Sequence, residues 1–283
     1  MKNDALVLAG GGVAGIAWEI GVLTGLQEAR PEFVDQLLAP TTTLVGTSAG
    51  STVAAQLALG LPLPDLFASQ LAETTAELLV DVDLGAFLQT MTEIVAGATS
   101  PDEQRRRVGA MALAAQTSST AARMAVIEAR IPTPDWPHRP LRISGVNART
   151  GELRVFDATS EVSLIDAVAA SCAVPGIWPT VEIAGENYMD GGMRTVANAD
   201  LAAGADRVLI LVPGRETGPL GAALPADELA SLAPGRVHSV FADEASVGAM
   251  GLNPLDPATR RPTALAGRAL GLQIADVVAD FWR

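Results

Sequence analysis

The first sixty residues contain two consecutive units in which a short apolar run ends in a glycine-rich turn and an apolar helical pattern follows. In "ALVLAGGGVAG", residues 5–9 predict a buried parallel strand and residues 13–29 predict a helix. In "TTTLVGTSAGSTV", residues 42–45 predict a strand and residues 51–59 a helix. Two such units in succession favour an α/β architecture, a sandwich whose central, mostly parallel sheet is flanked by helices.

The rest of the chain predicts further helices and strands. Residues 62–131 are Ala-rich and helical, "LRISGVNA" and "GELRVFDA" alternate as a pair of strands, and residues 206–214 form a buried-type strand. Two short strands are expected around "AGEN". The final segment, "ALAGRALGLQIADVVADFWR", predicts a helix that docks its apolar face on the core.

We find no internal repeat and no long linker, so we predict one domain over residues 1–283. Its core motifs lie within residues 5–213, with a helical insert at about 62–131 and a helical tail at about 215–283.

Composition excludes several classes of protein. A net charge of −13 argues against nucleic-acid binding and against more than transient contact with anionic membranes, because both need clustered cations. Cys172 is the only cysteine, so no disulfide forms within the chain, and we expect a small buried core residue there. Two histidines and one cysteine do not make a structural zinc site.

The apolar N-terminus fits neither a signal peptide nor a membrane span, because Glu19 and several glycines interrupt it. We therefore expect a cytoplasmic location.

The glycines of the first turn, Gly10, Gly12 and Gly15, have the spacing G-x-G-x-x-G. One interpretation is a dinucleotide-binding turn, which requires a second strand ending in Asp or Glu about 20 residues later. Asp35 stands at that distance, although "PEFVDQLLAP" is a poor strand. The other interpretation is an oxyanion site, because backbone N–H groups at a helix start bind negative charge of any origin.

The second turn, "GTSAG", is a G-x-S-x-G motif between a predicted strand and a predicted helix. A turn this tight strains its serine and exposes the hydroxyl at the carboxyl edge of the sheet, with the positive end of the helix behind it. We therefore predict that Ser48 is a nucleophile. The alternative is an ordinary small-residue turn or a phosphate cradle.

A nucleophilic serine needs a base, and the candidates are His138, His238 and Asp190. The order Ser48, Asp190, His238 matches an α/β-hydrolase triad. Against a triad, only one predicted strand precedes Ser48, and no His-Gly-Gly run follows that strand. Asp190 lies in "YMDGG", where the glycines allow close approach to another loop, although an Asp-Gly turn capping its own backbone is the common alternative.

Taken together, "GGGVAG", "GTSAG" and "DGG" in this order resemble the patatin-like phospholipases, a family of lipid acyl hydrolases, over residues 5–213. The resemblance implies a patatin-like fold and hydrolysis of lipid carboxylic esters by a Ser48–Asp190 dyad, as in a phospholipase A, a lysophospholipase or a general esterase. It implies backbone N–H donors at Gly10, Gly11 and Gly12 and a lipid or small ester substrate. The sequence itself gives no reason to expect a cofactor or a metal.

One departure from the family concerns the glycine loop, where Ala14 stands in place of the usual Arg or Lys. Backbone donors survive this change, whereas a cation that would assist anionic substrates is missing. The alternative function is therefore a weakly active or inactive lipid-binding scaffold. For an acyl-binding cleft we expect apolar walls from two segments: Leu78, Leu79, Phe87, Leu88, Met91 and Ile94 of the insert, and residues 174–178.

Overall fold

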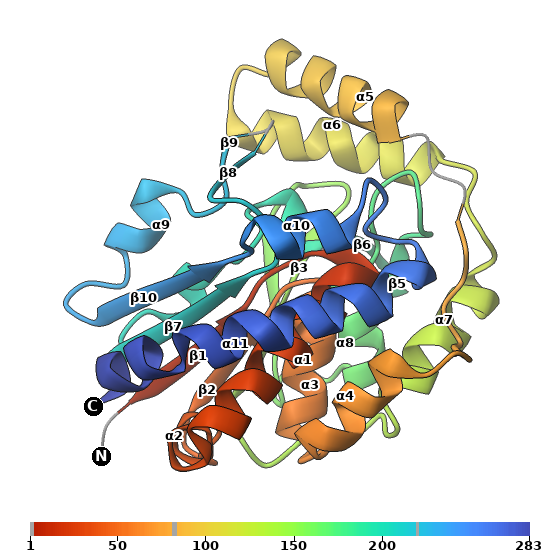
Figure 1. Cartoon of the computed structure of the whole chain (residues 1–283). Helices are drawn as coiled ribbons and strands as arrows, with labels where there is room; N and C mark the ends of the chain where they lie inside the picture. Colours follow the sequence, from red (N-terminus) through yellow and green to blue (C-terminus); the bar gives the residue numbers. More distant parts are fainter. Residues whose placement is uncertain (1–2, 81–83, 219–220) are drawn as a thin grey trace.

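The computed structural model describes residues 3–80, 84–218 and 221–283, which form a central sheet with helices packed on it (Figure 1). The strands of this sheet are β1 (Asp4–Leu8), β2 (Thr43–Gly46), β3 (Leu141–Asn147), β4 (Leu153–Phe156), β5 (Val181–Ile183), β6 (Glu186–Asp190), β7 (Arg207–Val212) and β10 (Arg236–Phe241). A separate two-residue pairing joins β8 (Thr217–Gly218) to β9 (Gly221–Ala222).

The strand order is β10-β7-β1-β2-β3-β6-β5, with β4 also paired to β3. Neighbours from β10 to β3 run parallel, whereas β4 and β6 are antiparallel to β3 and β5 is antiparallel to β6. The predicted mostly parallel sheet is therefore confirmed. The strand β10 was not predicted, because "GRVHSVF" lies among glycines and prolines that favoured a loop.

The helices surround this sheet. They are α1 (Gly12–Ala29), α2 (Pro31–Leu37), α3 (Ala49–Ala58), α4 (Leu63–Leu71), α5 (Leu84–Gly97), α6 (Pro101–Ala114), α7 (Thr120–Arg130), α8 (Leu164–Ser171), α9 (Ala226–Ala230), α10 (Glu244–Met250) and α11 (Arg260–Trp282), with short 3-10 turns η1 (Gly191–Met193), η2 (Ala199–Ala202) and η3 (Pro257–Thr259). No described helix is long and apolar enough to cross a membrane.

Alternate residues of β1 face two separate apolar cores. Leu6 and Leu8 pack in the larger core with α1, α3 and α11, whereas Ala5 and Val7 face a smaller core formed with η2 and the region around α9. Each face of the sheet is thus covered, as the continuous apolar sequence of this strand requires.

The tail is part of the core, because α11 lies directly against α1 (Figure 1). A Cβ on Gly21 or Gly25 would overlap the backbone of α11, and a Cβ on Gly267 or Gly271 would overlap that of α1. These small residues let the two helix backbones approach closely. The predicted docked terminal helix is confirmed, although Val277, expected on its apolar face, is 61% exposed.

Within the insert, α5 and α6 lie side by side above the sheet (Figure 1). Met91 of α5 and Val108 of α6 form a small core with Val146 of β3 and Met189 of β6. This cluster fixes the two helices over the end of β6, which is the end that carries Asp190.

Candidate active site

The topology brings Ser48 and Asp190 to one point. On β3, Ile143 pairs with Gly46 of β2 and Gly145 pairs with Asp190 of β6, while both β3 residues pair with β4 on their other side. Strands β2 and β6 therefore follow one another along the same edge of β3 and run toward each other. The turn after β2 and the end of β6 meet there.

The turn after β2 has the strained geometry expected of a nucleophile elbow. Ser48 has φ 51° and ψ −116°, an uncommon conformation for a residue with a side chain. Both flanking glycines are required sterically, because a Cβ on Gly46 would clash with Ser51 and one on Gly50 with the Leu8 carbonyl. Because the Ser48 N–H donates to Ser171 Oγ at 2.9 Å, the strained residue is held in place.

Asp190 is 2% exposed, and burial raises the pKa of its carboxyl to about 6. The Ser48 hydroxyl, the Gly192 N–H and the positive charge of Arg123 act in the opposite direction and lower this pKa. Oδ1 accepts the Gly192 N–H at 2.7 Å, whereas Oδ2 is buried with no hydrogen-bond partner among the described residues. A buried carboxylate next to the Ser48 hydroxyl, with a pKa raised to about 6, is suited to accept a proton.

A buried asparagine connects the turns that carry the two residues. The Nδ2 of Asn198 donates to Thr47 Oγ1 at 3.1 Å and to the Gly191 carbonyl at 3.1 Å, and it also reaches Ser144 Oγ of β3 at 3.3 Å. Thr47 precedes the nucleophile and Gly191 follows the aspartate. Asn198 was not singled out from the sequence; its only signal is an Asn shortly after "DGG", and its left-handed backbone (φ 48°) appears only in the fold.

The glycine loop lies against the serine, since a Cβ placed on Gly10 would be 3.5 Å from Ser48 Cβ. Its donors differ from the prediction at one position: the Gly10 N–H donates to the Val196 carbonyl at 2.7 Å and is not available to a substrate in this conformation. Within the described part of the chain, no partner is recorded for the N–H groups of Gly11 and Gly12. These two groups remain candidates for binding an oxyanion.

The tail contributes to this loop. The Pro254 carbonyl accepts the Ala14 N–H at 2.9 Å, and a Cβ on Gly12 would meet Pro254 and Leu255. The Ala14 side chain is fully buried, so the position that departs from the family pattern faces the interior of the protein.

Neither histidine is placed to act on Ser48. His238 lies on β10, which β7 and β1 separate from β2, a lateral distance of about 14 Å at the usual strand spacing. Its ring packs on Phe281 with centroids 5.3 Å apart, and burial lowers its pKa. His138 is exposed and precedes the N-terminal end of β3, at the opposite end of this strand from the Asp190 pairing. The structure does not form the Ser-His-Asp triad.

The dinucleotide interpretation is also unsupported by the fold. Asp35 lies within α2, not at the end of a strand, and the strand that follows, β2, ends in the serine turn. Cys172 is buried as predicted, and its Sγ donates to the Ser48 carbonyl at 3.2 Å.

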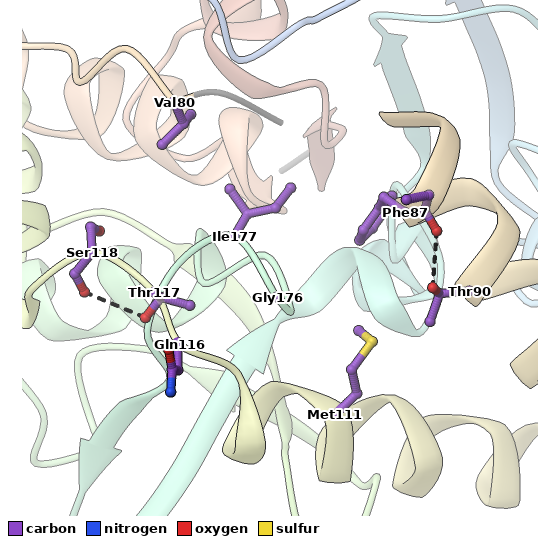
Figure 2. Close-up of a pocket in the computed structure, with 10 residues that line it drawn as sticks. Val80, Phe87, Thr90, Met111, Gln116, Thr117, Ser118, Gly176 and Ile177 are labelled. Carbon is purple, nitrogen blue, oxygen red and sulfur yellow. Dashed lines mark hydrogen bonds between the residues drawn. The ribbon is translucent and has the colours of Figure 1, made fainter. Parts of the chain in front are cut away.

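A cleft of about 380 Å³ lies between the insert and the loop after α8 (Figure 2). Val80, Phe87, Met111 and Ile177 border it with Gln116 to Ser118, so Phe87 and Ile177 are walls as predicted. Others of the predicted set do not line it: Leu79 and Leu88 are exposed, and Met91 is buried in the small core under α5.

A second, narrower hollow of about 20 Å³ is lined by Ser48 and Gly12 together with Arg123, Val174 and Trp178. The segment between Val174 and Trp178 thus borders both spaces. Arg123 is the functional candidate that sequence reasoning missed in the insert, because one arginine in an Ala-rich amphipathic helix carries no signal of its direction.

Comparison with known proteins places the chain in a family. The model of the patatin-like phospholipases matches residues 6–203, and the chain belongs to this family. No curated protein sequence matches significantly. Among solved structures, VipD from Legionella pneumophila is similar over 98% of this chain and 67% of its own length, at 15% identity and a TM-score of 0.47.

ExoU, determined also in complex with SpcU from Pseudomonas aeruginosa, is similar as well. Over 99% of this chain and 53% of the ExoU chain in that complex, identity is 17% and the TM-score 0.42. For ExoU alone the chain spans 54% of the other protein, at 19% identity and a TM-score of 0.43. Members of the patatin-like family are lipid acyl hydrolases, which makes hydrolase activity the general expectation for this site.

Proposed function

We propose that this protein hydrolyses carboxylic esters of lipids through an acyl-enzyme, with Ser48 as nucleophile and Asp190 as base. The observation that carries the proposal is the meeting of a strained serine turn with a buried carboxyl whose pKa is raised to about 6. Near neutral pH most of this carboxyl is ionised, and it still holds a proton better than a solvent-exposed aspartate does.

In the proposed reaction, Asp190 accepts the hydroxyl proton as Ser48 Oγ forms a bond to the ester carbonyl carbon. The carbonyl electrons move onto its oxygen, and the N–H groups of Gly11 and Gly12 stabilise that charge. As the carbonyl re-forms, the bond to the alcohol breaks and Asp190 returns the proton to the departing oxygen. Water then repeats the sequence on the acyl-enzyme and releases the fatty acid.

The alternative is a lipid-binding scaffold without turnover, and the engaged Gly10 N–H favours it because fewer donors remain for the oxyanion. Initial rates on nitrophenyl esters of increasing chain length and on phospholipids distinguish the two. We expect turnover by the wild type and none by Ser48→Ala. Equal rates for the two proteins would refute the proposal, and absence of turnover by the wild type on every ester would favour the scaffold.

A further inference from the structure

Arg123 extends from α7 to the site of the proposed chemistry. It lines the same narrow hollow as Ser48 and Gly12 and is only 7% exposed. Its guanidinium carbon stands 4.1 Å from the ring centroid of Trp178, so the cation lies over the indole face. This stacking helps to hold the side chain in its direction toward the hollow.

The guanidinium of Arg123 is largely without partners. Its Nε is buried and makes no hydrogen bond to any described residue, and its Nη2 donates only a long bond of 3.5 Å to the Cys172 carbonyl. No carboxylate of the described residues forms an ion pair with it. About two turns further along α7, Arg130 is paired with Glu77 through two hydrogen bonds, of 2.9 and 2.6 Å.

A buried cation that no carboxylate contacts directly is costly to a fold unless something compensates it. The charges of Glu77 and Asp190 act on Arg123 only at a distance, without a hydrogen bond or ion pair to it. Burial lowers the pKa of Arg123 only to about 10, so the group is cationic at neutral pH. Among charged groups near it, Arg130 is neutralised by Glu77, and Asp190 is the proposed base. The glycine loop supplies no charged side chain. An anion from outside the protein would therefore gain a charge-assisted hydrogen bond here.

We propose that Arg123 is the anion-binding residue of the active-site cleft and that it contacts a phosphate oxygen of an acyl ester substrate. The inference rests on the proposed function and adds to it the residue that would distinguish phosphate-bearing esters from neutral ones. The hollow of about 20 Å³ has room for one oxygen-sized group, so one phosphate oxygen enters it and the rest of the headgroup stays outside.

The test compares two soluble substrates that differ only in the phosphate, 1-hexanoylglycerol 3-phosphate and 1-hexanoylglycerol. For Arg123→Met we expect kcat/KM on the phosphate ester to fall about 10- to 100-fold, mainly through KM, because a charged hydrogen bond is lost. On the neutral ester we expect a change below about threefold at about pH 8, where Asp190 is ionised in the wild type and losing the charge of Arg123 has little effect on the base. Arg123→Lys, which keeps the charge, should fall between the wild type and Arg123→Met. Arg149→Met, at an exposed arginine in the β3–β4 turn, should match the wild type on both substrates.

An equal loss on both substrates would assign Arg123 a structural role and overturn the proposal, as would an unchanged ratio. A second measurement needs no folded variant: glycerol 3-phosphate should inhibit wild-type hydrolysis of the neutral ester competitively, whereas glycerol should not. Absence of that inhibition contradicts the proposal. If the wild type hydrolyses neither these two esters nor any nitrophenyl ester or phospholipid, the proposed function fails. Calorimetric binding of glycerol 3-phosphate that is lost in Arg123→Met would still support the anion site.

Discussion

The sheet core and the helical insert both border the site, but they are built differently. In the core, Ser48 and Asp190 are nearly inaccessible, and the turns that carry them are joined by hydrogen bonds through Asn198. In the insert, α5 is largely exposed, and the cleft beside it is lined by apolar side chains such as Phe87 and Met111. From this difference we expect the backbone geometry of the core to set the proposed chemistry and the insert to select the ester.

The largest expected effect is on catalysis and lies in the core. Ser48→Ala should lower kcat on a nitrophenyl ester by about 10⁴-fold or more, since the nucleophile is removed. His238→Ala, on the distant strand β10, should retain most of the activity. Steady-state kinetics, with circular dichroism as a folding control, check both variants. A collapse of activity in His238→Ala would support the Ser-His-Asp triad instead.

The next largest difference should be in the unfolding free energy, which we expect to depend more on side chains of the core than on those of the insert. Leu23→Ala, fully buried in α1, should lower the unfolding free energy by about 3–5 kcal/mol. Leu88→Ala, 38% exposed on α5, should change it by less than about 0.5 kcal/mol. Urea denaturation measures both, and similar losses would mean that the insert is as tightly integrated as the core.

We expect the buried carboxyl of Asp190 to lower the unfolding free energy of the protein when it is ionised. Its folded-state pKa of about 6 exceeds the usual 3.8, so the wild type loses stability as pH rises from about 4 to 6. Asp190→Asn should therefore raise the unfolding free energy at pH 7 by roughly 2–3 kcal/mol, a gain that vanishes below pH 4. The exposed Asp135→Asn serves as control. A pH-independent difference would contradict the raised pKa.

The smallest effect concerns selectivity. Phe87→Ala should change the relative kcat/KM of long and short acyl esters by about threefold to tenfold, because an apolar wall is worth one to a few methylene groups. Leu88→Ala, one residue along α5 and outside the cleft lining, should leave the preference unchanged. A series of nitrophenyl esters measures this ratio for both variants. An equal change of the ratio in the two variants would mean that the cleft does not select the acyl chain.

The sequence predicts the parts of the site that depend on local backbone rules. Strand, tight turn and helix identify Ser48, and glycine spacing identifies the loop beside it, because these features follow from sterics over a few residues. The hydrogen bond from the Gly10 N–H to the Val196 carbonyl could not be predicted from the sequence, because it joins segments far apart in the chain.

Other features depend on packing that sequence patterns do not carry. Arg123 and Asn198 could not be singled out from the sequence, because their roles depend on neighbours far away in the chain. Arg123 lies beside Ser48 and Trp178, and Asn198 donates to Thr47 and Gly191. The edge strand β10 was missed because tertiary pairing with β7 overrides its weak local signal. The insert was predicted as helical, yet only part of its apolar sequence faces the cleft.

The central claim is that Asp190 activates Ser48, and labelling with a fluorophosphonate followed by peptide mass spectrometry tests it most directly. We predict a single adduct on the peptide containing Ser48. Its rate of formation should rise with pH, with a midpoint near pH 6, and level off above about pH 7, where the carboxyl is mostly ionised. Asp190→Asn should label far more slowly at every pH. An adduct on another residue, or equal labelling of Asp190→Asn and the wild type, would contradict the account.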